Sequence, residues 1–452
     1  MRLFLLCRVG NATARAVGCC DRAALRLTLR ANCSLPLAPP AARPSSVGLG
    51  AAVPVIPLLA IQLQDNIALA GLVITMGGAG RLTVSYATGY MLDKFGRRRV
   101  ALVGVTIRMI FSFAEGLSPT YLALVGSRFM SGVGTAIWGT GLATITADIS
   151  TRADRGSITG GRQGWMHLGH VIGPGLGAAV WGATGDIRMP FFINGVSKLI
   201  CLLVFIFLMV ETRSLSEADE SEAKPAAKPE STAGEAGPKL GRVAVWGAIF
   251  ASGFFLVLVG LFAAGLFRAA VADTLVPVFV RNELGLSQST LGLVLSATGV
   301  GGLIAAPIGG RMTDRWNVAW VMLPGAALMA LGMLAFTLEP SSVVMISLGV
   351  LLGAGSTLVH VGTNVFAIDI SPVGARGRFF GQTQAAMHAA ALVGPIVVGG
   401  LADWAGFGSA FVLLAVFFAA LAPVGMVMAR HQRAMARSTE STIRLLSGGP
   451  SA

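Results

Sequence analysis

The chain has little charge for its length. Only 12% of its 452 residues are Asp, Glu, Lys or Arg, whereas 54% are apolar, and the mean hydropathy is +0.73. A water-soluble chain this long would need more charge on its surface. The composition therefore excludes an ordinary soluble domain and indicates a membrane protein.

Motifs of catalysis and metal binding are missing as well. The sequence holds no G-x-x-x-x-G-K-(S/T) loop and no Cys/His spacing typical of a metal site. Four of the five cysteines lie in the first 33 residues, and the fifth is Cys201, so no disulfide framework follows. We therefore expect neither enzymatic activity nor a cofactor or bound metal.

Apolar stretches long enough to cross a bilayer recur along the chain. A hydrocarbon core takes roughly 18–25 helical residues, and lipid-exposed backbone must satisfy its own hydrogen bonds, so such stretches form helices. We place twelve of them near residues 46–63, 68–91, 100–117, 119–147, 158–182, 190–210, 246–279, 286–308, 318–338, 341–368, 379–402 and 407–429.

The net charge of +13 is concentrated in short loops on one side of these helices, which argues against a nucleic-acid-binding surface. The loops on the other side hold mainly acids, namely Asp65, Glu115, Asp186, Glu283, Glu339 and Asp403. By the positive-inside rule, both termini should face the cytosol or the equivalent compartment of an organelle. The plasma membrane and an organelle membrane both remain open.

A basic loop with the sequence GYMLDKFGRRR occupies residues 89–99. Gly89 and Gly96 allow a tight reversal, and Asp93 can meet a helix end or an arginine. The pattern resembles the signature loop between helices 2 and 3 of the major facilitator superfamily, G-x-x-x-D-(R/K)-x-G-(R/K)-(R/K). The resemblance implies an all-α membrane protein of twelve helices, with two pseudo-symmetric six-helix bundles around a central cavity.

The second half of the chain repeats the first at a fixed offset of 221 residues. Gly89 and Asp93 correspond to Gly310 and Asp314, and the repeat runs without a gap as far as Gly173-Pro174 and Gly394-Pro395. Two copies of one membrane unit in parallel order are expected for the halves of such a transporter.

The resemblance also implies a cytosolic gate that latches the halves in the outward-facing state. In this superfamily the acid that ends helix 4, here Asp148, pairs with a loop arginine, here Arg97. The full implied network is Gly89, Asp93, Gly96, Arg97, Arg98, Arg128, Asp148, Asp314, Arg315 and Asp369. Because Val318 replaces Arg97 in the second copy, we expect Asp314 and Asp369 to pair with Arg311 or Arg315 in a weaker latch. The alternative is that these charges only set the topology.

Two further motifs point to exchange. Arg128 begins a sequence that resembles R-x-x-(Q/S)-G-x-G, whose arginine faces the cavity and is linked to proton transfer in the family; a buried structural pair is the alternative. Helix 5 resembles G-x8-G-x3-G-P-x2-G-G, characteristic of antiporters including drug:proton exchangers, through Gly160, Gly169, Gly173, Pro174 and Gly177, with Ala178 replacing the last glycine. These glycines would let helix 5 pack closely against a helix of the other half, and Pro174 would bend it.

Ionisable residues inside the apolar stretches are candidates for binding substrate or protons. They are Arg81, Arg108, His167, Arg268, Asp273 and His388. A proton carrier must change protonation near neutrality, which suits Asp273, His167 or His388, although each histidine could instead be a hydrogen-bonded packing residue. Lys198 could simply extend toward the membrane surface.

Three segments lie outside the predicted bundles at 46–210 and 244–430. Residues 1–45 are rich in arginine and poor in acids, which suits a transit peptide, a disordered arm or a wrongly predicted exon, and their prolines would break the start of helix 1. Residues 211–243 are predicted to be a cytosolic linker, and residues 431–452 a basic tail.

The sequence therefore predicts a secondary active transporter, most directly a proton-coupled antiporter that exports a small organic molecule by alternating access. We expect a monomer whose partners are this substrate, protons and membrane lipid. One alternative is a uniporter or symporter of a sugar or organic anion that would use Arg81, Arg108 and Arg268. Another is a receptor or scaffold on the same fold that transports nothing.

Overall fold

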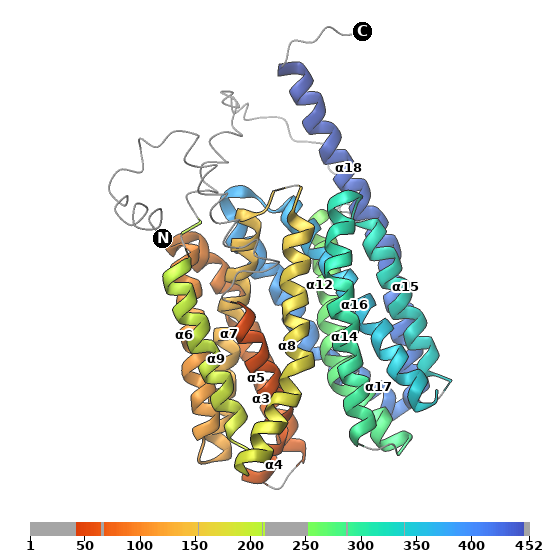
Figure 1. Ribbon diagram of the computed structural model, residues 1–452. Helices are drawn as coiled ribbons and strands as arrows, with labels where there is room; N and C mark the ends of the chain where they lie inside the picture. The colour runs from red at the N-terminus through yellow and green to blue at the C-terminus, as the bar shows by residue number, and fades with distance from the viewer. Residues whose placement is uncertain are drawn as a thin grey trace.

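The computed structural model describes residues 42–64, 67–151, 153–209, 211–212, 252–285, 288–338 and 340–446. This part of the chain is helical and contains no β-strand. Figure 1 shows the helices standing side by side in two bundles, α3 to α9 and α12 to α18. Eight described segments are long and apolar enough to cross a membrane, and the longest of them, residues 376–435, contains two spans joined at Gly406.

The first half contains six spans. The first is made of α3 (Ala42–Ala52), a 3-10 turn (Val53–Val55) and α4 (Ile56–Leu63). The others are α5 (Ile67–Phe95), α6 (Arg97–Leu117), α7 (Tyr121–Ile149), α8 (Arg155–Thr184) and α9 (Met189–Leu208).

The second half repeats this order. Its first span runs through α12 (Gly253–Leu266), the π-helical η3 (Phe267–Leu275), α13 (Val276–Val278) and the π-helical η4 (Phe279–Glu283). Then follow α14 (Gln288–Arg315), α15 (Ala319–Phe336), α16 (Ser342–Ile370), a 3-10 turn (Val373–Ala375), α17 (Arg376–Ala419) and α18 (Leu421–Leu446). The predicted fold of twelve spans in two bundles is confirmed.

The first span begins at Ala42, a few residues before its predicted start. Pro44 falls in the first turn of α3, where a missing N–H leaves no helical hydrogen bond unmade. The earlier prolines, the N-terminal cysteines, most of the predicted linker and the last residues of the tail lie outside the described residues.

The 221-residue offset extends over the whole of both bundles. Gly185, with φ of 70°, ends α8, and its counterpart Gly406, with φ of 83°, marks the bend inside α17. Both glycines precede the last span of their half, and both have a positive φ, which glycine tolerates best. Since this pair lies beyond the repeat found in the sequence, the two halves correspond residue by residue to their final spans.

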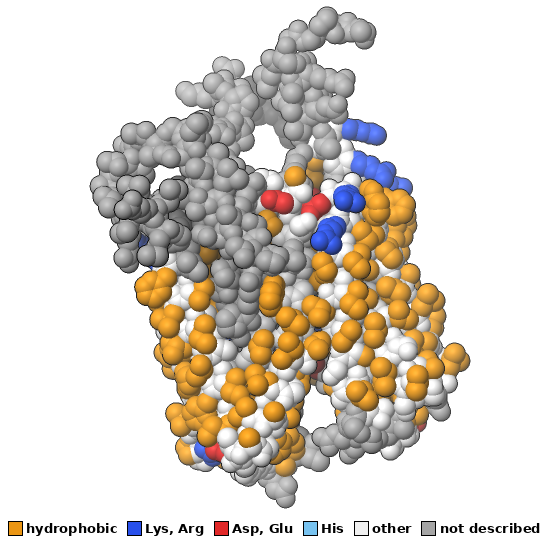
Figure 2. Space-filling view, in the orientation of Figure 1, with side chains coloured by type: hydrophobic (Ala, Val, Ile, Leu, Met, Phe, Trp, Pro, Cys, Tyr) orange, Lys and Arg blue, Asp and Glu red, His pale blue; other side chains and the backbone are white. Residues whose placement is uncertain are grey.

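The described surface is largely apolar, as a lipid-facing surface must be. Figure 2 shows apolar side chains covering the flanks of both halves, with charged side chains gathered near the ends. Exposed examples include Leu122, Val343 and Trp404. This distribution fits a protein whose flanks lie in hydrocarbon and whose ends lie in water.

The two halves meet mainly through two helix pairs, α5 with α17 and α8 with α14, and α8 also contacts α16 while α17 contacts α7. We call the end of the bundle at which Asp93 and Asp314 lie the motif end, and the opposite end the open end. Figure 2 shows a hollow between the halves at the open end, at the bottom of the view. At the motif end, by contrast, contacts between the halves close this space.

Candidate gate and transport site

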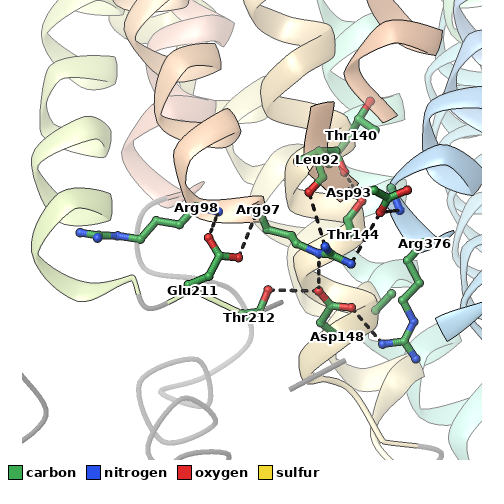
Figure 3. Close-up of polar contacts among 12 residues, drawn as sticks. Leu92, Asp93, Arg97, Arg98, Thr140, Thr144, Asp148, Glu211, Thr212 and Arg376 are labelled. Carbon is green, nitrogen blue, oxygen red and sulfur yellow. Dashed lines mark hydrogen bonds and ion pairs between the residues drawn. The ribbon is translucent and has the colours of Figure 1, made fainter. Parts of the chain in front are cut away.

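Arg97 and Asp148 meet at the motif end of the first half (Figure 3). The Arg97 Nε lies 3.1 Å from Asp148 Oδ2, and both side chains are buried. Arg97 also lies 3.7 Å from Asp93 Oδ1 and donates a hydrogen bond of 3.4 Å to the carbonyl of Leu92. The structure thus brings together three residues of the network that the family resemblance implied.

Asp93 binds the start of α17 in the other half. Its carboxylate accepts hydrogen bonds from the backbone N–H groups of Gly377 and Arg378, both at 2.9 Å. Because α17 begins at Arg376, the carboxylate occupies the positive end of this helix. A Cβ at Gly377 would lie 2.6 Å from Asp93 Oδ1, so the approach requires glycine. Gly89 lies against the same turn of α17, where a Cβ would be 2.5 Å from the Gly377 carbonyl oxygen.

Asp314 makes the equivalent contact in the opposite direction. It accepts hydrogen bonds from the backbone N–H groups of Gly156 (2.6 Å) and Ser157 (2.7 Å) at the start of α8, and from the Ser157 hydroxyl. The expected pairing of Asp314 with Arg311 or Arg315 is wrong, because three donors at a helix N-terminus already satisfy this carboxylate. Arg315 is exposed and forms no ion pair within the described chain.

Besides the exposed pair of Arg378 Nε with Asp93 Oδ2 (3.4 Å), two ion pairs that are less exposed join the halves beside these helix ends. Arg376 Nη1 lies 2.9 Å from Asp148 Oδ1, and Arg155 pairs with Asp369 at the position related by the 221-residue offset. The expectation that Asp369 turns to Arg311 or Arg315 is therefore also wrong. Its partners are an arginine of the other half and Gln432, whose Nε2 donates at 2.6 Å.

We call Asp148 with its partners the first latch, and Asp369 with its partners the second latch. The first comprises Asp148, Arg97, Arg376 and the hydroxyl of Thr212, which lies 3.1 Å from Asp148 Oδ2. The second comprises Asp369, Arg155 and Gln432. Each latch therefore contains one arginine contributed by the opposite half.

Glu211 and Gln432 belong to the contacts at the motif end, although neither was predicted from the sequence. Glu211 accepts hydrogen bonds from the backbone N–H groups of Arg97 (2.9 Å) and Arg98 (3.1 Å), at the start of α6. Gln432 accepts one from Val318 N (3.1 Å), at the start of α15. Because 211 and 432 differ by 221, extending the repeat to the last span of each half would have found the pair.

Gly96 allows the turn between α5 and α6, and Arg98 ties it to α9. The φ of Gly96 is 93°, and a Cβ there would lie 2.7 Å from the Glu211 carboxylate. The Arg98 side chain donates to the carbonyl of Ile206 at 2.8 Å. Both residues shape the loop without contacting the second half directly.

Arg128 does not belong to the network at the motif end. It precedes Asp148 by 20 residues on the same helix, a separation of about 30 Å along α7. Its Nη1 lies 3.3 Å from Glu115 Oε1 instead. Glu115, which the sequence placed in a loop, is fully buried in the last turn of α6.

Ionisable groups of both halves meet in the space toward the open end. Arg268 Nε lies 3.3 Å from Asp273 Oδ2, and Arg268 Nη1 lies 3.3 Å from His170 Nε2 on α8 of the first half. Both Arg268 and Asp273 belong to η3, whose i→i+5 hydrogen bonding brings residues five apart onto one face. Their side chains are 46% and 52% exposed, so they face the space between the halves.

Arg81 completes this candidate transport site. It lies on α5 within electrostatic range of Arg128, Arg268 and Asp273, and its Nε donates to the carbonyl of Gly77 at 3.1 Å. Arg81, Arg268 and Asp273 were all predicted candidates, but the predicted histidine was His167 and not His170. In the structure His170 contacts Arg268, whereas His167 faces Thr357.

His167 and His388 each hydrogen-bond to a hydroxyl of the opposite half. His167 Nε2 lies 2.8 Å from Thr357 Oγ1, and His388 Nδ1 lies 2.9 Å from Ser85 Oγ. Their positions are related by the repeat, and both join the halves between the motif end and the candidate transport site. Arg108 lies elsewhere, buried between α6 and α7 against Gly134.

The glycines of α8 pack mainly within their own half, which corrects the prediction that they all face the other half. Gly169 lies against Ser46 of α3, while Gly173 and Gly177 lie against Ala51. Of the four glycines of the predicted motif, only Gly160 meets the second half, where a Cβ would lie 2.3 Å from the Ala306 carbonyl oxygen and 3.1 Å from Gly310 Cα on α14. Small residues thus let α8 approach two helices at once, with Pro174 inside the helix.

A family model described as Major Facilitator Superfamily matches residues 44–281 and 266–444. The chain belongs to the Major Facilitator Superfamily. Together the two matches cover nearly all of the described chain, once for each half. The protein is thus a multi-pass membrane transporter and not an enzyme.

Curated relatives of this superfamily chain include proteins named for drug resistance. Multidrug resistance protein 1 of Bacillus subtilis (strain 168) is 23% identical over 270 residues, which cover 60% of this chain and 64% of that protein. Quinolone resistance protein NorA of Staphylococcus aureus (strain COL) is 22% identical over 363 residues, 79% of this chain and 87% of that protein. The match to the first relative thus spans less than two thirds of its length.

Solved structures of this fold match nearly the whole chain. The human organic anion transporter MFSD10 (TETRAN) superposes with a TM-score of 0.68 at 15% identity, covering 90% of this chain and 100% of that chain. A bacterial homologue of the iron transporter ferroportin in an outward-facing state gives a TM-score of 0.64 at 15% identity, covering 90% and 98%. At this identity the likeness shows the fold alone.

Proposed function

We propose that this transporter exports a small organic molecule in exchange for protons, by alternating access, with its motif end in the cytosol. The main support for the proposal is that polar contacts between the halves lie at two levels along the bundle. Paired contacts join the halves at the motif end, while Arg268, Asp273 and His170 meet toward the hollow at the open end.

The orientation follows from charge. The loops at the motif end carry most of the bases of the described chain, and basic loops favour the cytosolic side. With this orientation the structure is outward-facing, and the two latches are the contacts that must break before the site opens inward.

The pairing of Arg268 with Asp273 supports proton exchange. A proton on Asp273 would neutralise the carboxylate and release the Arg268 guanidinium, which could then bind an acceptor group of the substrate. Substrate and proton would thereby alter each other's affinity at one site, as coupled transport requires. The names of the relatives, which refer to multidrug and quinolone resistance, support efflux of organic compounds.

One specific observation favours a second candidate, transport of an organic anion without exchange. Arg81 and Arg268 outnumber Asp273 at the candidate transport site, so the site carries excess positive charge. An organic anion could bind there with no proton involved. Uniport or symport would then replace antiport on the same scaffold.

Purified protein in liposomes that contain a pH-sensitive dye would separate these functions. The compounds tested would be a fluorescent quinolone, fluorescein, tetraphenylphosphonium and glucose, added one at a time. Proton exchange predicts proton movement opposite to the compound in the wild type and its loss in Asp273→Asn. Asp403→Asn, which changes an exposed carboxylate of the same half, is the matched control and should behave as wild type. Compound flux without proton movement would exclude antiport.

A further inference from the structure

A cluster of charged side chains is buried inside the first half, apart from both the latches and the candidate transport site. It contains Arg108 and Glu115 of α6, Arg128 of α7 and Lys198 of α9. Lys198 is 1% exposed and Glu115 is 0% exposed, so neither reaches water at a membrane surface. The expectation that Lys198 extends toward the surface is therefore wrong.

Lys198 has only neutral hydrogen-bond partners. Its Nζ donates to Asn194 Oδ1 at 2.5 Å and to Ser112 Oγ at 2.7 Å. It forms no ion pair with any carboxylate of the described residues, although Glu115, which pairs with Arg128 through Oε1, lies within electrostatic range. A buried ammonium that no carboxylate contacts directly is unfavourable, so its retention needs an explanation.

The second half builds the same positions from apolar residues. At the 221-residue offset the counterparts of Arg108, Ser112, Glu115, Arg128, Asn194 and Lys198 are Met329, Met333, Phe336, Gly349, Ala415 and Ala419. Met329, Met333 and Phe336 are fully buried in the core of that half. The fold therefore needs no charge at these places, and apolar replacements of buried ions are often neutral or stabilising. This comparison argues that the cluster serves function rather than folding.

The cluster can change its charge at one of its cations. Arginine keeps its proton in proteins, whereas a buried lysine can exist as a neutral amine. The charged groups that face Lys198 are Arg108 and Glu115 from α6 and Arg128 from α7, with the Cys201 thiol on its own helix. Gly48 of α3 packs against Asn194 and Ser197 and adds no charge. The ionisable side chains of α8 face the second half, namely Arg155, Arg162, His167 and His170.

A path of contacts leads from this cluster to the candidate transport site. Glu115 holds Arg128, and Arg128 lies against Gly77 of α5, where a Cβ would be 3.4 Å from its Nε. The carbonyl of Gly77 also accepts the hydrogen bond from Arg81. A change of charge at Lys198 can therefore alter the position of Arg81 through Glu115 and Arg128.

We propose that Lys198 is a second proton-binding site, built into the first half and separate from Asp273. In one state of the cycle water reaches Lys198, and the ammonium gives its proton to that water and becomes an amine; the amine takes a proton back before water is excluded again, as in the state described here. No other bond forms or breaks. The proposal rests on the proposed proton coupling, and it makes the first half the proton-sensing half.

The test measures how pH changes the distance between the two halves at the open end when no substrate is added. Spin labels would replace Leu122 and Val343, two exposed residues at the open end that the repeat relates, in a background with all five cysteines replaced. Pulsed electron resonance in nanodiscs would give the distance distribution in acidic and in alkaline buffer. The wild type should shift between two populations as the pH changes.

Two substitutions of Lys198 should lock opposite populations. Lys198→Met removes the charge at nearly constant volume and should give the alkaline population at every pH. Lys198→Arg keeps the charge and should give the acidic population at every pH. If Lys198 had only a structural role, the two variants would not give opposite populations. If one variant fails to fold, the pH response of the other still tests the proposal.

The outcomes separate the two proposals. If both Lys198 variants shift with pH as the wild type does while Asp273→Asn does not, the Lys198 site is excluded and proton exchange at Asp273 stands. If the wild type shows no shift with pH and no proton movement in liposomes, proton coupling itself is excluded together with the Lys198 site.

Discussion

The two latches use the same inter-half contacts but differ in what surrounds the acid. Asp148 is bound by Arg376 of the other half, by Arg97 and by Thr212, and its side chain is 0% exposed. Asp369 is bound by Arg155 of the other half and by Gln432, and its side chain is 18% exposed. The contact duplicated in both halves is the arginine from across the interface. Arg97 is therefore an addition that buries the first latch more deeply.

The second half keeps its contacts across the interface although it lacks an arginine at the position of Arg97. Val318 stands where the first half has Arg97, yet Asp369 still has an arginine and Asp314 still binds a helix N-terminus. The duplicated elements are the helix N-termini at Arg155 and Arg376, not the basic loop itself. We therefore expect both latches to matter, with the buried one dominating.

The largest effect should come from Asp148→Asn. This change leaves Arg97 and Arg376 buried with no carboxylate between them, and removing one partner of a buried pair costs about 3–5 kcal/mol. The motif end should open in most molecules, as measured by labelling of a cysteine introduced at Ser150 with a water-soluble thiol reagent. Asp403→Asn in the same background should leave the labelling rate unchanged. A rate in Asp148→Asn equal to wild type would show that the first latch does not hold this end closed.

A methyl group at either helix N-terminus should have a smaller effect, and the effect should be greater at Gly156. A Cβ at Gly377 would lie 2.6 Å from Asp93 Oδ1, whereas one at Gly156 would lie 2.0 Å from Thr313 Oγ1 and 2.1 Å from the Gly310 carbonyl oxygen. Gly377→Ala and Gly156→Ala should each weaken closure by about 1–3 kcal/mol, the usual cost of overpacking. The same labelling assay measures both. Gly399→Ala, where the added Cβ meets nothing, is the control. A greater effect of Gly377→Ala than of Gly156→Ala would contradict this ranking.

Asp369→Asn should cost less than Asp148→Asn. Its pair with Arg155 is partly exposed, and pairs that remain near water contribute about 1 kcal/mol or less. Labelling should therefore increase only a few-fold, and added salt should weaken the wild-type contact here more than at Asp148. If Asp369→Asn opens the motif end as fully as Asp148→Asn, the difference in burial does not set the strength of the latches.

The smallest effect should come from Val318→Arg, which installs the missing arginine. The new side chain would share Asp369 with Arg155 and should stabilise closure by at most about 1 kcal/mol. Transport measured in liposomes should slow by no more than severalfold, with unchanged protein yield as the folding control. Faster transport or greater labelling would mean that the second half cannot hold an arginine at this position.

The sequence was sufficient for the fold because helix length and apolar composition are local properties, and the internal repeat can be recognised from the residues alone. The twelve spans follow from such segments, whereas the meeting of Arg97 with Asp148 was predicted from the family resemblance. The partners of Asp314 and Asp369 could not be predicted in this way, since they come from helices about half a chain away. Arg128 was misplaced because the family motif gives its identity but not its depth along α7.

The other incorrect predictions concern which side chains are buried and which neighbours they face. Glu115 follows an apolar stretch and precedes a turn, so its sequence context fits a loop acid, and only the packing of α6 against α7 and α9 shows it inside. His170 and His167 are three residues apart on α8, and the sequence cannot decide which one faces Arg268. The glycines of α8 were assigned to one partner helix, although their spacing serves two.

The most direct test of the gate is the distance between the halves at the motif end. Phe95 is the last residue of α5, and Trp316 directly follows α14 at the position that the repeat relates to it. Both residues are exposed, so spin labels there report opening directly. A gate predicts one short distance in the resting protein, and a second, longer population that appears during exchange and dominates in Asp148→Asn. A single unchanged distance in every condition, including Asp148→Asn, would contradict the gate.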